Sequence, residues 1–352
     1  MRVAFVALET THYRDTDGAR RFERVAKLLA GRGHDVTVFC AQWWDGYDET
    51  VERDGVTYRA VTVSPAVASF TARVPALLAL DRPDVVHVRP SPPVAAVSAS
   101  VGATLARAPL VAEWFGDEPD ESARFYERAA TAPDMVVTPS EMVRTAVREA
   151  GATAETSTVI PESIDMSVVR DVEPAAEVDV AYAHPLDGSA NLESVLLGLA
   201  ELRDRDWSAT VIGDGPARAD YERQAADLRI DDRVTFAGAC DRERRVAVYK
   251  GAHAFVQTAY REYFATEFLW ALASGCVGIV EYQAESSAHE LVREHERSFR
   301  VTDPQELADA IVDAGDFERL TVDESWADYD HDAVLERYLE TYRSLRDAYG
   351  MF

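Results

Sequence analysis

The chain has 352 residues, enough for two domains of average size, and 47% of them are hydrophobic, as in an ordinary globular protein. It carries 62 acidic against 36 basic residues, and the resulting net charge of −26 repels nucleic acid and anionic lipid. The sequence contains no run of eighteen apolar residues that would span a membrane, and residues 1–8 read as a buried strand instead of a signal peptide.

Strand-like apolar runs alternate with helical patterns through the first 160 residues. The first strand is predicted at Arg2–Leu8, and the first helix at Ala19–Gly31, where apolar residues share one face and glycines end the pattern. Further strands are predicted at Asp35–Cys40, Val56–Val63, Asp84–Arg89, Pro109–Trp114, Met135–Pro139 and Ser157–Ile160. Further helices are predicted at Val67–Leu80, Val94–Ala106 and Glu141–Ala150. This alternation predicts an α/β domain with a parallel sheet.

A polar segment rich in proline and glutamate then interrupts the alternation, which predicts an interdomain linker. A second series of strands begins at Val178–Ala183 and continues at Ser208–Ile212, Arg233–Ala237, Ala254–Gln257 and Val277–Tyr282. Its helices are predicted at Ala190–Asp204, Ala217–Leu228, Arg242–Gly251, Thr266–Ser274 and Ser287–Glu294. We therefore expect an N-terminal domain at residues 1–165, a linker at 166–177 and a C-terminal domain at 178–327.

The last predicted element is an amphipathic helix within residues 328–352. One stripe of Asp330–Tyr349 carries apolar side chains, at Val334, Leu335, Tyr338, Leu339, Tyr342 and Leu345. Such a stripe must pack against another part of the protein.

Two features of the composition indicate where the protein works. The three cysteines stand singly, which fits a reducing cytoplasm and provides no metal-ligand spacing. The acidic excess, with Lys27 and Lys250 as the only lysines, is typical of proteins from organisms that keep molar salt in the cytoplasm. We therefore expect a halophilic protein that needs high ionic strength, because salt screens its self-repulsion.

Several short motifs recur in a fixed order. The N-terminal half contains the glycine loop Asp17-Gly18 and the runs Gly33–Val38, Asp84–Val88, Val136–Ser140 and Val159–Asp165; the C-terminal half contains Val211–Pro216, Arg233–Gly238 and Ala271–Gly275. This ordered set resembles the retaining glycosyltransferases of the GT-B fold, family 4 (group 1) type. The resemblance implies two Rossmann-like doubly wound domains facing across a cleft, with the last helix crossing back onto the N-terminal domain.

The resemblance also implies a function. It implies transfer of a hexose-type sugar from a nucleotide-sugar donor, of unknown base, to a glycan or lipid-linked acceptor, with retention and without a metal ion or cofactor. The N-terminal domain would face the acceptor and the C-terminal domain would bind the donor. An acceptor on a lipid carrier would bring this cytoplasmic protein into peripheral contact with the inner membrane face. The sequence does not indicate the oligomeric state.

The implied donor site lies in the C-terminal half. Glu262 matches the first glutamate of the family's E-x7-E motif, which contacts the donor sugar, and the backbone of Tyr263, Phe264, Ala265 and Thr266 opens a helix that suits a phosphate. Gly213, Asp214 and Gly215 form a turn on which a nucleoside could lie, or simply a tight turn. Gly18 belongs to the N-terminal glycine loop.

The same site departs from the family pattern. The second glutamate of the motif falls on Trp270, while Glu267, three residues earlier on the helix, would return to a similar face. The family's arginine and lysine, which clamp the diphosphate, fall on His184 and Ala190. Three arginines are candidates to replace that charge: Arg14, Arg20 and Arg261.

The catalytic-side histidine of many family members falls on Trp114 or Phe115, with carboxylates nearby. Glu113 and Asp117 would then act in catalysis or cap the next helix. Because several donor-site residues are lost together, an alternative function stays open: a catalytically degenerate GT-B protein that binds a glycan or regulates an active glycosyltransferase.

Overall fold

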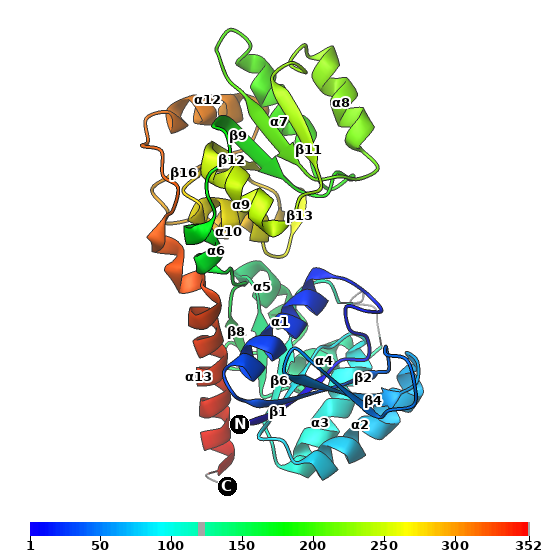
Figure 1. Ribbon diagram of the computed structural model, residues 1–352. Coiled ribbons are helices and arrows are strands. Elements are labelled where there is room, and N and C mark those ends of the chain that lie inside the picture. Colours follow the sequence, from blue (N-terminus) through cyan, green and yellow to red (C-terminus); the bar gives the residue numbers. More distant parts are fainter. Residues whose placement is uncertain (119–123, 351–352) are drawn as a thin grey trace. The chain divides into compact units, whose positions relative to one another are not determined.

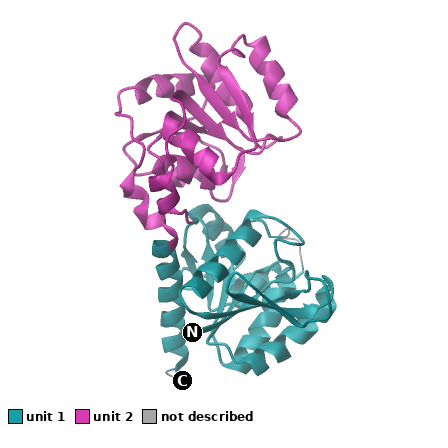
Figure 2. Ribbon diagram, in the orientation of Figure 1, with its two compact units in different colours: residues 1–162, 332–352 teal, residues 163–331 magenta. Residues whose placement is uncertain are grey.

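The computed structural model describes residues 1–118 and 124–350. They divide into two compact units, which we call unit 1 (residues 1–162 and 332–352) and unit 2 (residues 163–331) (Figure 2). The chain therefore passes from unit 1 to unit 2 after Glu162 and returns after His331. Each unit is built on its own largely parallel sheet, which confirms the predicted fold class of two doubly wound α/β domains.

Unit 1 contains an eight-stranded sheet of order β3-β4-β2-β1-β5-β6-β7-β8 (Figure 1). Its neighbouring strands pair in parallel, except for the antiparallel hairpin of β3 and β4. The strands are β1 (Arg2–Val6), β2 (Asp35–Ala41), β3 (Thr50–Arg53), β4 (Val56–Thr62), β5 (Val85–Val88), β6 (Leu110–Glu113), β7 (Met135–Thr138) and β8 (Ser157–Val159).

Helices cover both faces of this sheet. The helices α1 (Asp17–Gly31) and α13 (His331–Gly350) share one hydrophobic core with the sheet, while α2 (Val67–Asp81) and α3 (Pro93–Ala106) pack against each other (Figure 1). Two shorter helices complete the unit, α4 (Tyr126–Thr131) and α5 (Glu141–Glu149).

The C-terminal helix α13 belongs to the core of unit 1. Its predicted apolar stripe is buried there, at Val334, Leu335, Tyr338, Leu339 and Tyr342. The stripe therefore finds its partner in the N-terminal part of the chain, as the resemblance implied.

Unit 2 contains a six-stranded parallel sheet of order β11-β10-β9-β12-β14-β16 and a two-residue pair, β13 with β15. The strands are β9 (Val178–Ala183), β10 (Ala209–Ile212), β11 (Val234–Gly238), β12 (Ala252–Gln257), β13 (Arg261–Glu262), β14 (Val277–Glu281), β15 (Glu285–Ser286) and β16 (Ser298–Val301). One face is covered by α7 (Leu192–Glu201), α8 (Arg218–Asp227) and α12 (Pro304–Ala314). The other face is covered by α6 (Met166–Asp171), α9 (Arg242–Gly251) and α10 (Thr266–Ala273). The short helix α11 (Ala288–Leu291) and the 3-10 helix Glu324–Tyr329 complete the unit.

Some elements differ from the sequence prediction. The edge strand β3 was not predicted, because its four residues are mostly exposed and lack an apolar alternation. The expected linker begins with α6, where Asp165 caps the helix and Met166 and Val169 are buried in the core of unit 2. The predicted helix Ser287–Glu294 shortens to the four residues of α11. None of the helices in residues 1–118 and 124–350 is long and apolar enough to cross a bilayer.

Candidate functional site

Two glycines shape the candidate donor site at the carboxyl ends of β9 and β10. Gly213 has a φ of +134°, and a Cβ on it would lie 2.0 Å from the carbonyl oxygen of His184. A Cβ on Gly215 would lie 2.4 Å from the carbonyl oxygen of Leu186. The Leu186 amide also donates to the carbonyl of Asp214 at 3.0 Å, which ties the two loops together. Glycine is therefore required here for close approach of two backbone segments.

His184 faces Glu262 at this edge of the sheet. The His184 Nε2 lies 3.4 Å from Glu262 Oε1, which also accepts a hydrogen bond from Gln257 Nε2 at 3.2 Å. The opposite ring nitrogen, Nδ1, donates to the carbonyl of Pro185 at 2.8 Å. Burial alone would lower the pKa of His184, but the hydrogen bond and charge of Glu262 outweigh it, so the pKa is raised above its usual 6.5. His184 is thus a titratable cation where the family pattern has a permanent one.

The loop Tyr263–Thr266 leads directly into α10. Ser287 holds it from the neighbouring loop: its amide donates to the Glu262 carbonyl and its hydroxyl donates to the Tyr263 carbonyl, both at 2.8 Å. Phe264 and Ala265 are buried, and Ala265 at the N-cap provides no capping side chain. The Thr266 amide donates to the Phe264 carbonyl at 2.9 Å, so it is the later N–H groups of the first turn of α10 that could meet an anion.

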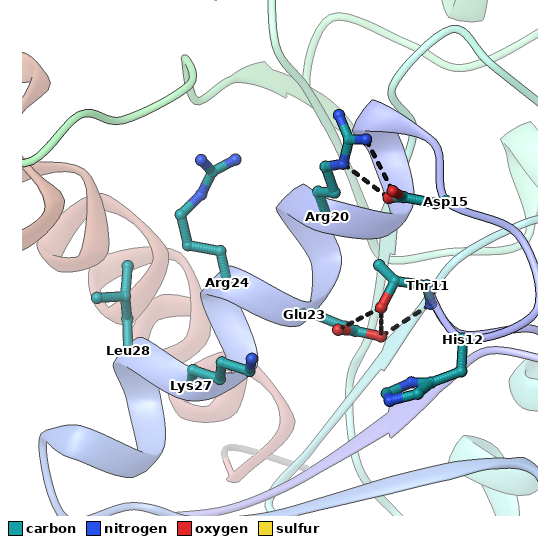
Figure 3. A pocket seen from close by; sticks show the side chains of 8 residues that line it. All are labelled: Thr11, His12, Asp15, Arg20, Glu23, Arg24, Lys27 and Leu28. Carbon is teal, nitrogen blue, oxygen red and sulfur yellow. Dashed lines mark hydrogen bonds and ion pairs between the residues drawn. The ribbon is translucent and has the colours of Figure 1, made fainter. Parts of the chain in front are cut away.

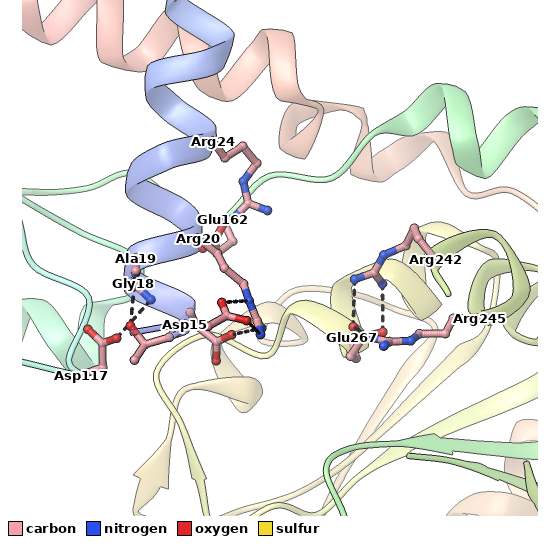
Figure 4. Close-up of polar contacts among 12 residues, drawn as sticks. Asp15, Gly18, Ala19, Arg20, Arg24, Asp117, Glu162, Arg242, Arg245 and Glu267 are labelled. Carbon is pink, nitrogen blue, oxygen red and sulfur yellow. Dashed lines mark hydrogen bonds and ion pairs between the residues drawn. The ribbon is translucent and has the colours of Figure 1, made fainter. Parts of the chain in front are cut away.

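Glu267 in the first turn of α10 is held by two arginines that the sequence reading missed. Arg242 donates to both its carboxylate oxygens at 3.0 Å, and Arg245 donates to Oε1 at 2.7 Å (Figure 4). The Arg242 guanidinium also lies 4.6 Å from the ring centroid of Trp270, so Glu267 and Trp270 share one face as expected from their spacing. Burial would raise the pKa of Glu267, but the two arginines outweigh it, and the pKa is lowered. In the sequence, only the i, i+3 spacing of Arg242 and Arg245 on α9 indicated that these two arginines share one face of the helix.

The three arginines proposed to replace the lost charge lie at the surface, and two of them pair with carboxylates there. Arg261 pairs with Glu285, and both side chains are more than half exposed. Arg20 pairs with Asp15 at 2.7 Å, and Arg14 is exposed. Ala190, at the other lost position, is buried, and its carbonyl accepts a hydrogen bond from Tyr182 at 2.6 Å.

Asp117 lies at the N-terminus of α1 in unit 1. Its Oδ2 accepts the Gly18 amide at 3.2 Å (Figure 4). Arg89 Nη2 donates to both carboxylate oxygens, at 3.1 and 3.0 Å. A Cβ on Gly18 would lie 2.4 Å from Asp117 Oδ1. The structure thus brings Gly18 and Asp117 together. The Asp117 carboxylate lies at the N-terminus of α1, which is the positive end of the dipole of that helix.

Glu118 follows Asp117 in the sequence and was not among the predicted site residues. Its carboxylate accepts the amides of Phe115 at 2.9 Å and Gly116 at 2.7 Å. Burial and then the charge of Asp117 raise the pKa of Glu118 above its usual range.

Glu113 is buried, and its environment argues against the catalytic role considered for it. Arg21 donates to its Oε1 and Tyr338 donates to its Oε2, while His87 Nε2 lies 3.1 Å from Oε2. The side chain is 1% exposed, so a substrate has no access to either oxygen. Among the described residues, no group of three His, Cys, Asp or Glu side chains is arranged to hold a metal ion.

Comparison with protein families and known proteins follows the division into two units. The family model for glycosyltransferase family 4 matches residues 18–168, and the model for glycosyl transferases group 1 matches residues 171–317. The alpha-monoglucosyldiacylglycerol synthase of Streptococcus pneumoniae is 34% identical over 87 residues, which are 24% of this chain. The match spans 20% of the length of that curated relative.

Solved structures share the fold over nearly the whole chain. A glycosyltransferase from Rickettsia africae has a TM-score of 0.77 at 14% identity, covering 97% of this chain and 98% of that one. The HepE protein from Anabaena in complex with UDP has a TM-score of 0.72 at 18% identity, covering 98% of this chain and 100% of that one. Sucrose-phosphate synthase from Thermosynechococcus elongatus has a TM-score of 0.70 at 17% identity, covering 98% of this chain and 99% of that one. At these identities the likeness shows the GT-B fold alone.

Proposed function

Because the chain belongs to the family 4 and group 1 type of glycosyltransferases, we propose that it moves a hexose-type sugar from a nucleotide-sugar donor to a glycan or lipid-linked acceptor, with retention. In this proposal unit 2 binds the donor and unit 1 binds the acceptor. The donor is the substrate, and the reaction uses neither a metal ion nor a cofactor. The protein would work in the cytoplasm, at the membrane face when its acceptor is lipid-linked.

The observation that carries the proposal is the arrangement of His184, Glu262 and Gly213 at the carboxyl ends of β9 and β10. In open α/β sheets this edge is where ligands bind. Gly213 lets the two loops approach closely and so fixes the backbone at His184, Glu262 provides hydrogen-bond acceptors for sugar hydroxyls, and His184 provides a protonatable group. Nearby, the first turn of α10 adds N–H groups that would stabilise charge on a departing diphosphate.

Known proteins suggest which substrates to test first. Solved structures of Anabaena HepE hold UDP, UDP with glucose, and UDP-glucose. The curated relative from Streptococcus pneumoniae is an alpha-monoglucosyldiacylglycerol synthase. We therefore propose a UDP-hexose as the first donor, and neutral glycans beside a diacylglycerol-type lipid as the first acceptors.

One observation favours the alternative of a degenerate binding or regulatory partner. Arg242 and Arg245 are engaged by Glu267, and Trp270 stands where the family places its second glutamate. Donor binding then depends on His184 as its cation, and loss of its proton would leave a weak donor site.

The deciding experiment is a calorimetric titration of nucleoside diphosphates and their sugars in molar KCl. We expect saturable binding of one base, with loss of binding in Glu262→Ala and Gly213→Val. Gly188→Ala is the matched control, since Gly188 is exposed in the same unit and an added Cβ would meet nothing within 4 Å. If no nucleotide binds to the folded protein, the transferase proposal is wrong and the alternative stands.

A further inference from the structure

Unit 1 contains a pocket along α1 that none of the family motifs accounts for (Figure 3). Its volume of about 490 Å³ is in the range of small-molecule sites, about 300–1,000 Å³. The loop after β1 contributes Thr11, His12 and Asp15, and α1 contributes Arg20, Glu23, Arg24, Lys27 and Leu28.

The charges in this pocket are balanced. Each of its cations has a carboxylate partner: Arg20 with Asp15 at 2.7 Å, Arg24 with Glu162 at 2.7 Å, and Lys27 with Asp54 at 2.9 Å. An anionic ligand would have to compete with these carboxylates. The pocket therefore suits a neutral polar ligand better than a phosphate.

The pocket residues still have hydrogen-bonding capacity. In the part of the chain that the structure describes, Arg24 uses Nη2 for Glu162 and Lys27 has Asp54 as its partner, so both keep further N–H donors. Glu23 Oε1 accepts the amide and the hydroxyl of Thr11 at 2.9 Å, while Oε2 accepts only the hydroxyl, also at 2.9 Å, and keeps a second lone pair. Donors and acceptors side by side match hydroxyl groups, which both donate and accept.

An exposed planar ring stands beside these polar groups. His12 stacks on Trp43, with ring centroids 3.6 Å apart and planes at 10°. Arg53 Nη1 donates to His12 Nε2 at 3.0 Å, which requires an unprotonated nitrogen. Burial, together with Arg53 and Lys27, outweighs the opposing charge of Glu23 and lowers the pKa of His12 below its usual 6.5, which favours the neutral ring. A neutral ring backed by an indole offers a flat, weakly polar face to the C–H face of a sugar.

From this combination we propose that the pocket is a sugar-binding subsite for a neutral glycan acceptor. One pyranose ring would lie against His12, while its hydroxyls bond to Arg24, Lys27 and Asp15. This proposal rests on the proposed function, because the bound sugar is an acceptor only if the protein is a glycosyltransferase. It names the class of that acceptor as a neutral sugar. Binding itself is independent of donor chemistry and is testable without turnover.

The test is saturation-transfer NMR with neutral mono- and disaccharides in molar KCl, on the full chain and on variants. We expect one sugar type to bind, with affinity reduced about tenfold in both His12→Ala and Lys27→Met, as expected for loss of one contact each. Both side chains are at the surface, so these variants should fold normally. Arg128→Met, at an exposed position of α4 in the same unit, is the matched control and should bind like the wild type.

The result separates this proposal from the donor proposal, because UDP binding is measured on the same samples. Sugar binding that is lost in both variants supports the subsite, whether or not UDP binds. Absence of binding by every sugar overturns it, even if UDP binds normally. Binding of inorganic phosphate with the same variant pattern, in place of sugar, also overturns it and makes the pocket an anion site.

Discussion

Arg21 Nε donates a hydrogen bond to Glu113 Oε1 at 2.7 Å, and the two side chains are 2% and 1% exposed. The hydroxyl of Tyr338 accepts from Arg21 and donates to Glu113 Oε2 at 2.9 Å. Arg21 lies in α1, Glu113 in β6 and Tyr338 in α13, so the ion pair joins three elements. The C-terminal helix is therefore fixed to unit 1 by a buried charge pair, both members of which hydrogen-bond to Tyr338.

Removing one charge of this pair should strongly destabilise unit 1. Glu113→Gln leaves Arg21 charged in a dry environment, and loss of one partner of a buried pair costs about 3–5 kcal/mol. Urea unfolding in molar KCl measures the change. The matched control is Asp35→Asn, which breaks the exposed pair of Arg2 and Asp35 and should cost at most about 1 kcal/mol. Equal effects of the two substitutions would contradict the structural role of Glu113.

The same pair predicts how stability changes in acid. Burial would raise the pKa of Glu113, but Arg21 and His87 lower it from 4.5 to about 2. The folded protein thus binds this proton less readily than the unfolded chain, so the stabilisation is full above pH 4.5 and is lost between pH 4.5 and about 2. It amounts to roughly 3 kcal/mol. Acid titrations of unfolding free energy should show a shallower slope in Glu113→Gln, and an unchanged slope would refute this assignment.

Much of the fold was predictable because it depends on local patterns. The buried run Val178–Ala183 forms β9 with the predicted bounds, and the helix Arg242–Gly251 forms α9 with its predicted bounds. Apolar runs and amphipathic periods predict which residues are buried, because both patterns are formed by residues close together in the sequence. The strand β3 escaped prediction because its position is set by pairing with β4 instead of by its own apolar pattern.

The candidate site was predictable only in part, since side-chain partners are set by the fold. In the sequence, Glu113 is only a carboxylate at the end of a predicted strand. Its partner Arg21 lies 92 residues earlier, so no local pattern predicts the pair. Likewise Arg242 and Glu267 are 25 residues apart and meet only because α9 and α10 cover the same face of the sheet. Gly213 and Gly215 were expected at a tight turn and lie in the loop between β10 and α8, but the need for close approach at Gly213 appears only in three dimensions.

His184 should make donor binding depend on pH. Burial lowers its pKa, but Glu262 outweighs burial and raises the pKa above the usual 6.5, so His184 keeps its proton to higher pH than an ordinary histidine and loses it as the pH rises further. If it contacts the diphosphate, UDP affinity should fall about tenfold over that rise, because a hydrogen bond from a charged donor is replaced by a weaker one. Calorimetric titrations between pH 6 and 9 would show this fall.

Two variants test whether His184 causes that dependence. In His184→Arg the affinity should be high and independent of pH, because the guanidinium stays charged. In Glu262→Gln the fall should move to lower pH, since the charge that raises the pKa of His184 is removed. A pH profile that is the same in wild type and His184→Arg would exclude His184 from phosphate binding.

The net charge of −26 predicts that the folded protein requires salt. Repulsion among the acidic groups is long-ranged in dilute buffer, whereas the screening length falls to about 3 Å at 1 M ionic strength. We expect the melting temperature to rise steeply from dilute buffer to molar KCl, with NaCl acting equally. Four exposed aspartates provide a matched test when replaced together by asparagine: Asp204, Asp206, Asp227 and Asp313. This variant should gain less from salt than the wild type, because it has less repulsion to screen. A melting temperature that is unchanged by KCl would show that the acidic surface carries no such penalty, and that the halophilic interpretation of the composition is wrong.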